Sequence, residues 1–274
     1  MIQSGGVNKT SLVERSGMSR STLYYRPKLP DKDWQVKCLI EEVLRVHPSY
    51  GHKRLALHLK INRKRILRVM HIFGIKPYRR RGKKPFKVSC PQDSVYPNLL
   101  ITSHPMYENH IWVADFTYLP FQGRFVYVAT VMDLFTRKIV GFSVLTNHST
   151  SLVLNAFLAA IHHERRPVIH HSDNGSEYDS KNFISLIEDV GTLISRSQKG
   201  CPWENGYQES FYSQFKVDLG DPNRFHNLGE LVYEIYKTIH TYNHSRIHTA
   251  LKMSPCEFAE RQKSITMKDV EKVS

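Results

Sequence analysis

The stretch His171-Ser172-Asp173-Asn174-Gly175 decides the fold, because it ends a buried strand with a carboxylate and a sharp turn. The residues before it, Pro167-Val168-Ile169-His170, have the apolar character of a buried strand. Asn174-Gly175 is a strong turn signal. Asp173 is therefore predicted to lie at a strand end, where its carboxylate can face an open cleft.

Two further carboxylates are candidates for the same cleft. Asp115 interrupts an aromatic and β-branched run, and Glu209 lies in a segment of helical character, with 35 residues between it and Asp173. Hard divalent ions such as Mg²⁺ prefer oxygen ligands. A pair of them about 3.5–4 Å apart can activate the attacking oxygen and stabilise the leaving oxygen of a phosphodiester. A single Asp in a strand more often faces solvent, but three carboxylates in these settings predict a metal site built from separate elements.

Four stretches of the chain resemble the insertion-sequence transposases of the IS-three type, in the product of their second reading frame. Asp115, Asp173 and Glu209 match the DDE triad that these enzymes share with retroviral integrases. The chain departs from the family pattern at Glu204-Asn205-Gly206, often Asp-Asn-Ala, and at Ile247, often Pro, and neither departure touches the triad. The matching stretches are Trp112-Val113-Ala114-Asp115-Phe116-Thr117-Tyr118, His171-Ser172-Asp173-Asn174-Gly175-Ser176-Glu177-Tyr178, Glu209-Ser210-Phe211-Tyr212 leading to Phe215-Lys216, and Tyr242-Asn243-His244-Ser245-Arg246-Ile247-His248-Thr249-Ala250-Leu251.

The resemblance implies an α/β, RNase H-like (integrase core) fold: a mixed sheet with helices, preceded by a small all-α helix-turn-helix region that binds DNA. It implies a DDE transposase that hydrolyses the phosphodiester at an element's end and uses the 3′-hydroxyl to attack another phosphodiester, through a circular intermediate. The catalytic and metal-binding residues would be Asp115, Asp173 and Glu209, with Mg²⁺ or Mn²⁺ as cofactor and two ions per site.

The partners that this family implies are double-stranded DNA, as terminal inverted repeats and as target, and further copies of the chain in a homo-oligomer on DNA. A protein or fusion from an upstream reading frame is a further expected partner. Two other functions fit parts of the pattern: a plain metal-dependent nuclease of the same fold, and a catalytically inactive, transposase-derived DNA-binding regulator. A degraded triad would favour the regulator, but all three carboxylates are present.

The charge of the chain is unevenly distributed. Its net charge is +14, yet residues 1–90 hold 22 Lys and Arg against 5 Asp and Glu, and residues 91–274 hold 17 against 20. This asymmetry predicts a basic, nucleic-acid-binding front and a nearly neutral body.

Cysteine and hydropathy patterns exclude several classes. The four cysteines are scattered without a Cys-x-x-Cys pair, so no zinc framework is visible, and the pairs His162-His163 and His170-His171 are interpreted as structural or surface histidines. No apolar run has the length of a membrane span, and the first residues lack a signal-peptide core. A cytoplasmic protein of a bacterial cell, associated with the nucleoid and not with a membrane, is expected.

Five regions are predicted along the chain. Residues 1–30 form a small helix-turn-helix, with Ser19 capping a short helix and Pro27 and Pro30 stopping helix formation. Residues 31–76 form a second, tri-helical DNA-binding unit, in which Asn62 caps the last, basic helix, the kind of helix that a major groove accepts. Residues 77–108 form a basic, Pro-rich linker, 109–262 the catalytic core, and 263–274 a tail.

The candidate DNA contacts are basic side chains in these regions, in the linker and near the catalytic site. Their alternative is a solvated, basic surface, and in the linker a flexible tether. They are Arg20, Lys53, Arg54, Arg63, Lys64, Arg65, Arg68, Arg79, Arg80, Arg81, Lys83, Lys84, Lys216 and Arg246.

Periodicity in the catalytic core predicts three antiparallel strands followed by helix, strand, helix and strand. In this order Asp115 falls on the first strand and Asp173 just after the fourth, and these strands are expected to be neighbours. A later helix is expected from about residue 228 to 242, and Ser254-Pro255 is expected to open a last short helix. The predicted strands are at 111–119, 124–134, 138–145, 168–171 and 192–195, with helices at 151–163 and 181–190.

The segment 205–219 is predicted to be a helix that closes the site. Tyr207, Phe211 and Phe215 are spaced four apart and would form one apolar stripe. Glu209 would lie on the other side, and Lys216, seven residues later, would share its face because seven steps of about 100° make nearly two turns. Glu204 is the competing third carboxylate, but it is expected before or at the helix start, so Glu209 is preferred.

Overall fold

A computed structural model of the chain describes residues 29–78, 95–198 and 205–271, the last six of these without side chains, and residues 13, 15, 17, 19 and 21. The predicted first helix-turn-helix, with Arg20, therefore lies largely outside the described residues. So do Glu204 and the basic run that holds Arg79, Arg80, Arg81, Lys83 and Lys84.

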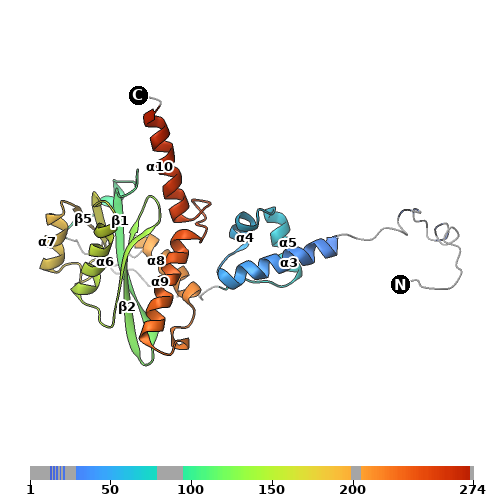
Figure 1. Cartoon of the computed structure of the whole chain (residues 1–274), viewed down its shortest axis with the longest axis horizontal. Coiled ribbons are helices and arrows are strands. Elements are labelled where there is room, and N and C mark those ends of the chain that lie inside the picture. Colours follow the sequence, from blue (N-terminus) through green and yellow to red (C-terminus); the bar gives the residue numbers. More distant parts are fainter. Residues whose placement is uncertain are drawn as a thin grey trace.

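The body is built on a five-stranded sheet with the order β3-β2-β1-β4-β5 (Figure 1). β1 pairs antiparallel with β2, and β2 with β3, whereas β1–β4 and β4–β5 are parallel. This is the predicted RNase H-like arrangement, with the strands of Asp115 and Asp173 side by side in the centre. The strands are β1 (Ile111–Phe121), β2 (Arg124–Asp133), β3 (Ile139–Leu145), β4 (Ile169–Ser172) and β5 (Leu193–Arg196).

The long β1–β2 hairpin turns at Gln122-Gly123, as predicted. Both residues have positive φ, 47° and 77°, which is the conformation of a tight turn whose twist matches the flanking strands. Glycine tolerates this conformation without strain.

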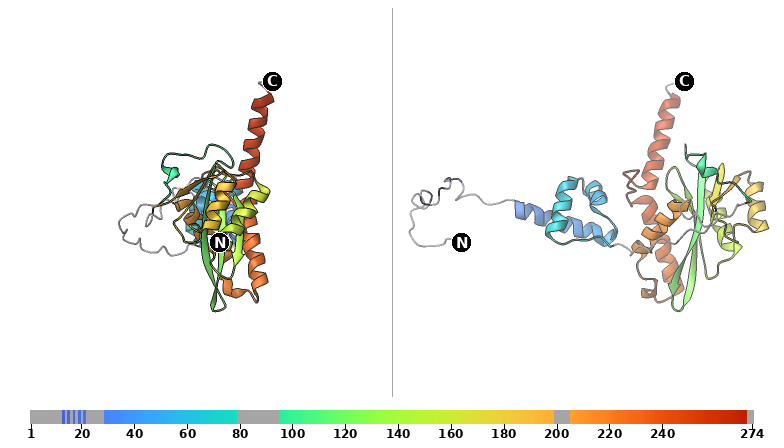
Figure 2. Two further views of the ribbon diagram at one scale, coloured as in Figure 1. Left: turned by 90° about the vertical axis from the view of Figure 1, so that its left-hand side faces the viewer. Right: turned by 180° about the vertical axis from the view of Figure 1, so that it is seen from behind.

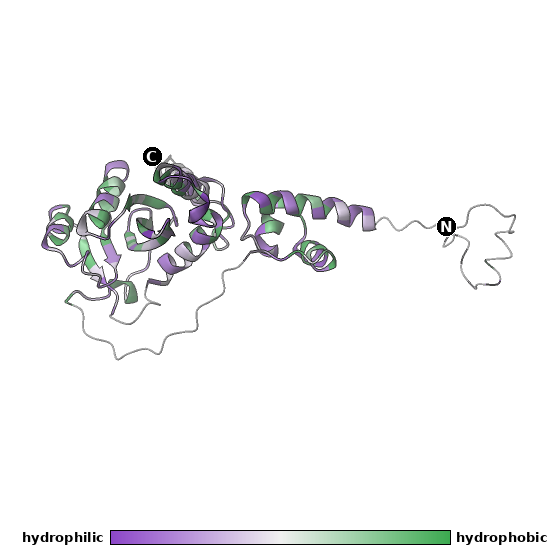
Figure 3. Ribbon diagram, turned by 90° about the horizontal axis from the view of Figure 1, so that it is seen from below, coloured by the Kyte–Doolittle hydropathy of each residue, from purple (hydrophilic) through white to green (hydrophobic). Residues whose placement is uncertain are grey.

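Helices cover both faces of the sheet (Figures 2 and 3). The alternation of side chains along β1 explains this: Ile111 and Val113 join one apolar cluster with α8 and α9, and Trp112 joins the other with α6 and α7. Both central strands are therefore buried on both faces. The helices are α6 (Thr150–His163), α7 (Lys181–Asp189), α8 (Gly206–Leu219) and α9 (Leu228–His244).

A three-helix unit precedes the body and lies beside it, on the side of α8 and α9 (Figure 1). It has a core of its own, formed around Ile40, Leu55 and Ile66, which are all fully buried. Asn62 caps the third helix as predicted, because its side chain accepts a hydrogen bond from the Lys64 N–H at 2.9 Å. The helices are α3 (Leu29–Val46), α4 (His52–Leu59) and α5 (Arg63–Ile72).

Two local expectations were wrong. Pro30 does not stop a helix but stands at the second position of α3, where proline lacks only an N–H that has no intrahelical partner. The described end of the expected linker region contains η1 (Leu99–Ile101), whose Leu99 N–H donates to Ser195 Oγ at 2.9 Å. The last helix, α10 (Pro255–Glu271), is not short but has 17 residues, and it projects from the body in Figure 1.

None of the helices in the described part of the chain is long and apolar enough to cross a membrane.

Candidate active site

Asp115 and Asp173 occupy equivalent positions on two neighbouring strands. The parallel pairing of β1 with β4 sets Val113 opposite His171. Each Asp follows two residues later, Asp115 still within β1 and Asp173 one residue past the end of β4. Because side chains on a strand alternate between its faces, the two carboxylates lie on the same side of this pair of strands.

The turn after β4 holds Asp173 in place. Its Oδ1 accepts a hydrogen bond from the Gly175 N–H at 3.1 Å, and the Asn174 amide donates to the Ser197 carbonyl at 2.8 Å. A Cβ at Gly175 would approach Asp173 Oδ1 to 3.1 Å and Glu177 Oε2 to 3.2 Å. Asn174-Gly175 therefore gives both the turn that the sequence predicts and the space for the carboxylate.

Helix α8 is fastened to β1 by buried polar side chains on either side of Glu209. The Gln208 amide donates to the Val113 carbonyl at 2.7 Å, and the Tyr212 hydroxyl donates to the Asp115 carbonyl at 2.6 Å. Thr130 of β2 also bonds to both side chains, at 3.1 and 2.8 Å. These bonds fix the first turns of α8, and with them Glu209, next to the backbone of Asp115.

The predicted apolar stripe of α8 is only partly correct. Phe211 and Phe215 are buried, but Tyr207 is 44% exposed and its ring lies 4.1 Å from the guanidinium of Arg137. The buried face instead includes Gln208 and Tyr212, because β1 and β2 offer them backbone and hydroxyl partners. Glu209 is exposed beside this face, as expected of a residue that faces a cleft.

The electrostatics of Asp115 reflect the charges of Asp173 and Glu209 nearby. The pKa of Asp115 is raised to about 7: burial, then the charge of Asp173 and then that of Glu209 raise it, whereas the Phe116 N–H, which donates at 2.8 Å, and Lys216 lower it. Burial also raises the pKa of Asp173, against the Gly175 N–H and Arg196. Like charges held together in this way favour a bound cation.

The donor set fits a hard divalent cation, because carboxylate oxygens are the ligands that such ions prefer. In the described residues, no group of three or more His, Cys, Asp or Glu side chains is already close enough to enclose a metal ion. Asp115, Asp173 and Glu209 are thus near enough to perturb protonation, without forming a closed cage.

Lys216 lies on the same side of α8 as Glu209. Its ammonium is 5.2 Å from the ring of Tyr118, which is on β1 three residues after Asp115, and its charge lowers the pKa of Asp115. This position agrees with the predicted face.

Only some of the other candidate DNA contacts are available on the surface. Lys53, Arg63, Lys64 and Arg68 are exposed. Arg68 and the half-buried Arg65 of α5 approach Asp33 of α3, at 2.6 and 3.8 Å, so part of their charge is compensated within the unit.

The expectation that Arg246 contacts DNA was wrong, because its side chain is buried. Arg54, another candidate DNA contact, is half-buried. Arg246 is 3% exposed and donates to Asp218, Ser49 and Gln214, so it cannot reach DNA in this arrangement. The guanidinium of Arg54 lies 5.9 Å from the ring of Tyr50.

The two histidine pairs are as predicted. His170 and His171 are fully buried on opposite faces of β4, and His162 and His163 are exposed.

Arg196 is a site residue that sequence reasoning missed. Only 1% exposed, it donates to Ser172 Oγ at 2.6 Å and to the Tyr178 carbonyl at 2.8 Å, and its charge lowers the pKa of Asp173. The available signal was an arginine directly after a short apolar strand. A second missed contact joins His148 to Glu177 at 2.8 Å, beside the Asp173 turn.

Comparison with known proteins defines the class. Residues 106–202 and 190–255 match two families described as "Integrase core domain". Solved structures with a similar fold include the catalytic core of HTLV-2 integrase, at 20% identity and a TM-score of 0.45 over 57% of this chain and 99% of that one. Another is the simian T-cell lymphotropic virus intasome, at 18% identity and a TM-score of 0.49 over 77% of this chain and 70% of that one. The two family matches show that the protein has an integrase-type catalytic core and is a polynucleotidyl transferase.

The curated relatives define the family. The transposase for insertion sequence element IS904 of Lactococcus lactis is 33% identical over 80% of this chain and 91% of its own length. The insertion element IS600 31 kDa protein of Shigella sonnei is 30% identical over 91% of this chain and 96% of its own length. The putative transposase InsK for IS150 of Escherichia coli is 29% identical over 90% of this chain and 92% of its own length. The chain belongs to the insertion-sequence transposases of the IS-three type, and it is a DDE transposase of DNA transposition and integration.

Proposed function

We propose that this transposase cuts and joins DNA at its element's ends where β1, β4 and α8 meet, with Asp115, Asp173 and Glu209 as metal ligands. The convergence of charge at Asp115 carries this proposal, because Asp173 and Glu209 both raise its pKa. Two divalent ions suit the reaction: when bound, they would favour ionisation of the attacking oxygen and offset charge on the leaving oxygen.

The residues of the chain would each have a part in two successive reactions. In the first, water attacks the phosphodiester at the element end, the bond from phosphorus to the 3′ oxygen breaks, and that oxygen leaves as a 3′-hydroxyl. In the second, this hydroxyl attacks another phosphodiester, so that one such bond forms as one breaks. The buried contacts of Gln208 and Tyr212 would hold α8 in place, and Lys216 would bind a phosphate near the scissile bond as a point charge.

The partners follow from this chemistry. The exposed basic side chains of the three-helix unit would bind double-stranded DNA, either the terminal repeats or the target. The synapsis of two element ends calls for a homo-oligomer, and a circular intermediate and an upstream-frame partner are proposed from the family. A plain nuclease is the alternative, and it would yield nicks without joined products.

The test uses the full chain with Mg²⁺ and labelled element-end DNA. Asp173→Asn should abolish cleavage and joining while DNA binding, measured without metal, is unchanged. Asp189→Asn is the matched control, because Asp189 is exposed at the end of α7. Glu204→Gln should also remain active. Mg²⁺-dependent strand transfer by Asp173→Asn would contradict the assignment, and nicking without strand transfer by the wild type would favour the nuclease.

A further inference from the structure

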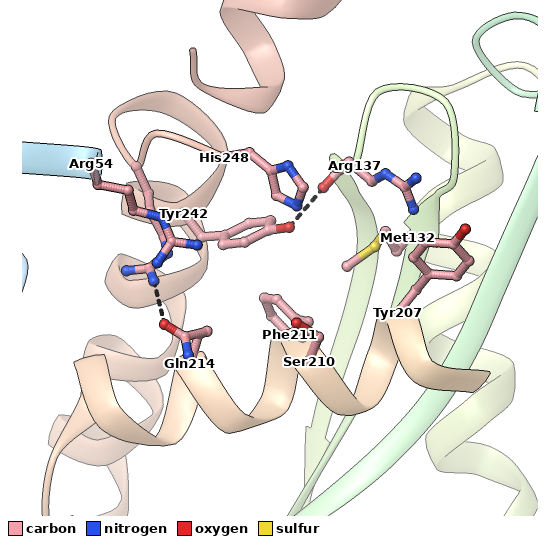
Figure 4. A pocket seen from close by; sticks show the side chains of 10 residues that line it. Arg54, Met132, Arg137, Tyr207, Ser210, Phe211, Gln214, Tyr242 and His248 are labelled. Carbon is pink, nitrogen blue, oxygen red and sulfur yellow. Dashed lines mark hydrogen bonds between the residues drawn. The ribbon is translucent and has the colours of Figure 1, made fainter. Parts of the chain in front are cut away.

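A small cavity of about 60 Å³ lies where the three-helix unit meets the body (Figure 4). Helix α8 forms its floor, and Arg54 and Arg137 stand at opposite ends with His248 between them. Arg54 comes from α4 and Arg137 from the β2–β3 turn. The cavity is lined by Arg54, Met132, Arg137, Tyr207, Ser210, Phe211, Gln214, Tyr242, Arg246 and His248.

The lining is strongly basic. Three arginines and a histidine border the cavity, and no carboxylate is among its lining residues in the described part of the chain. Asp218, behind Arg246, is the acidic group that compensates part of this charge. Burial, and then the charges of Arg137, Arg54 and Arg246, lower the pKa of His248 to about 4, so these three arginines surround a neutral imidazole.

Three buried nitrogen atoms of this lining have unused hydrogen-bonding capacity. Arg54 Nε, Arg137 Nη1 and His248 Nδ1 have no hydrogen-bond partner among the described residues. Arg246 differs, because it donates to Asp218, Ser49 and Gln214. Buried donors without partners cost about 1–3 kcal/mol each, and more when they are charged. Arg54 Nε and Arg137 Nη1 are charged donors, and the neutral His248 ring can donate from Nδ1 in one of its two tautomers. These groups around one cavity therefore indicate a ligand that accepts hydrogen bonds and carries negative charge.

We propose that this cavity binds a phosphate group. By the ordinary space that a buried water needs, about 10–15 Å³, the cavity has room for roughly four to six non-hydrogen atoms, and a phosphate has five. Its tetrahedral oxygens can accept from guanidinium groups on more than one side, and guanidinium is the group that proteins favour for phosphate. The phosphate could come from solution, or from the 5′ end of a DNA strand.

A phosphate here would add a link between the three-helix unit and α8 to those that Ser49 and Tyr50 already make with the body. Arg54 belongs to the three-helix unit, and Ser210 and Gln214 lie on α8, the helix of Glu209. An occupied cavity would thus stabilise the position of the three-helix unit relative to the helix that supplies a catalytic carboxylate.

The test is calorimetric titration of the full chain with inorganic phosphate, with chloride at matched ionic strength as reference. Arg137→Gln is the informative variant, because the Arg137 backbone carbonyl that accepts from Tyr242 is retained. We expect at least a tenfold weaker phosphate affinity in Arg137→Gln, as for the loss of one charged hydrogen bond, and partial recovery in Arg137→Lys. Arg165→Gln, at an exposed arginine before β4, should bind as the wild type does.

Two oligonucleotides distinguish the sources of phosphate. If a 5′-phosphorylated strand competes with inorganic phosphate and its 5′-hydroxyl counterpart does not, the natural ligand is a DNA end; if neither competes, it is free phosphate. Circular dichroism and thermal unfolding without phosphate verify that each variant is folded. No phosphate-specific heat in the wild type, or equal affinity in folded Arg137→Gln, would overturn the proposal.

Discussion

The guanidinium of Arg246 donates a 3.0 Å hydrogen bond to the hydroxyl of Ser49, 197 residues earlier in the chain. Arg246 follows α9, and Ser49 lies in the turn between α3 and α4. Asp218 of α8 completes the contact, because it accepts from both residues. This buried triangle, with the Ile247 N–H donating to the Tyr50 hydroxyl at 2.6 Å, fastens the three-helix unit to the catalytic body.

Arg246→Ala should lower the free energy of unfolding by about 3 kcal/mol, the lower end of the cost of breaking a buried ion pair, because it removes the main cation beside the partly buried Asp218 carboxylate. Urea unfolding measures this loss. The double variant Arg246→Ala with Asp218→Ala should lose less than the sum of the two single variants. Additive losses would show that the two side chains do not stabilise each other.

The raised pKa of Asp115 makes stability depend on pH. The folded state binds the proton more tightly than the unfolded state does, since the pKa is about 7 in the fold against the ordinary 3.8. The stability that proton binding at Asp115 adds to the folded state is therefore fully present below about pH 4 and is lost as the pH rises to about 7. Asp115→Asn should remove this loss, so that its melting temperature exceeds that of the wild type at pH 8 by several degrees, but not at pH 4.

The effect of Mg²⁺ on the melting temperature tests whether Asp115 binds metal. At pH 8 without DNA, Mg²⁺ should raise the melting temperature of the wild type and of Asp189→Asn, but raise that of Asp115→Asn much less. Equal Mg²⁺ stabilisation in all three proteins would remove Asp115 from the metal site, whatever the activity of the variants.

The sheet and the positions of Asp115 and Asp173 were predictable from local patterns. The strands are apolar runs bounded by turn residues, and the Asn174-Gly175 turn fixes where β4 ends. The buried side of α8 was not predictable in the same way. Helical spacing alone does not tell which of the neighbours Tyr207 and Gln208 is buried. Gln208 is buried only because the Val113 carbonyl, 95 residues away, accepts its hydrogen bond.

The burial of Arg246 was also not predictable, because it too depends on partners that are distant in sequence. A charged residue is usually exposed, so a basic side chain in a family motif was interpreted as a DNA contact. Its partners Asp218 and Ser49 lie 28 and 197 residues away in sequence. No local pattern identifies such a tertiary ion pair, whereas a resemblance spread over several motifs was enough to predict a triad.

DNA binding should separate the exposed from the paired cations of α5. Arg63→Ala with Lys64→Ala should weaken binding and reduce the slope of log affinity against log salt by about 2 if each contacts one phosphate. Arg68→Ala should change this slope less and lower stability more, since Arg68 pairs with Asp33 at 2.6 Å. Filter binding of the full chain between about 50 and 200 mM salt measures the slope. An unchanged slope in the double variant would place the DNA elsewhere.

Lys216 offers the sharpest test of how DNA lies in the cleft. Its ammonium is 5.2 Å from the Tyr118 ring, and its charge lowers the pKa of Asp115, so it faces the carboxylates. Lys216→Ala should reduce both end cleavage and strand transfer about tenfold or more, as for the loss of a charged hydrogen bond to phosphate. Lys216→Arg should recover part of the activity, because the charge survives while its geometry changes.

Lys237→Ala on α9 is the matched control, because Lys237 is exposed and pairs only loosely with Glu234 at 3.4 Å. Rates are best measured at moderate salt and sub-saturating DNA, where a lost phosphate contact is not masked. If Lys216→Ala then cleaves and joins at the rate of Lys237→Ala, DNA does not pass along this face of α8.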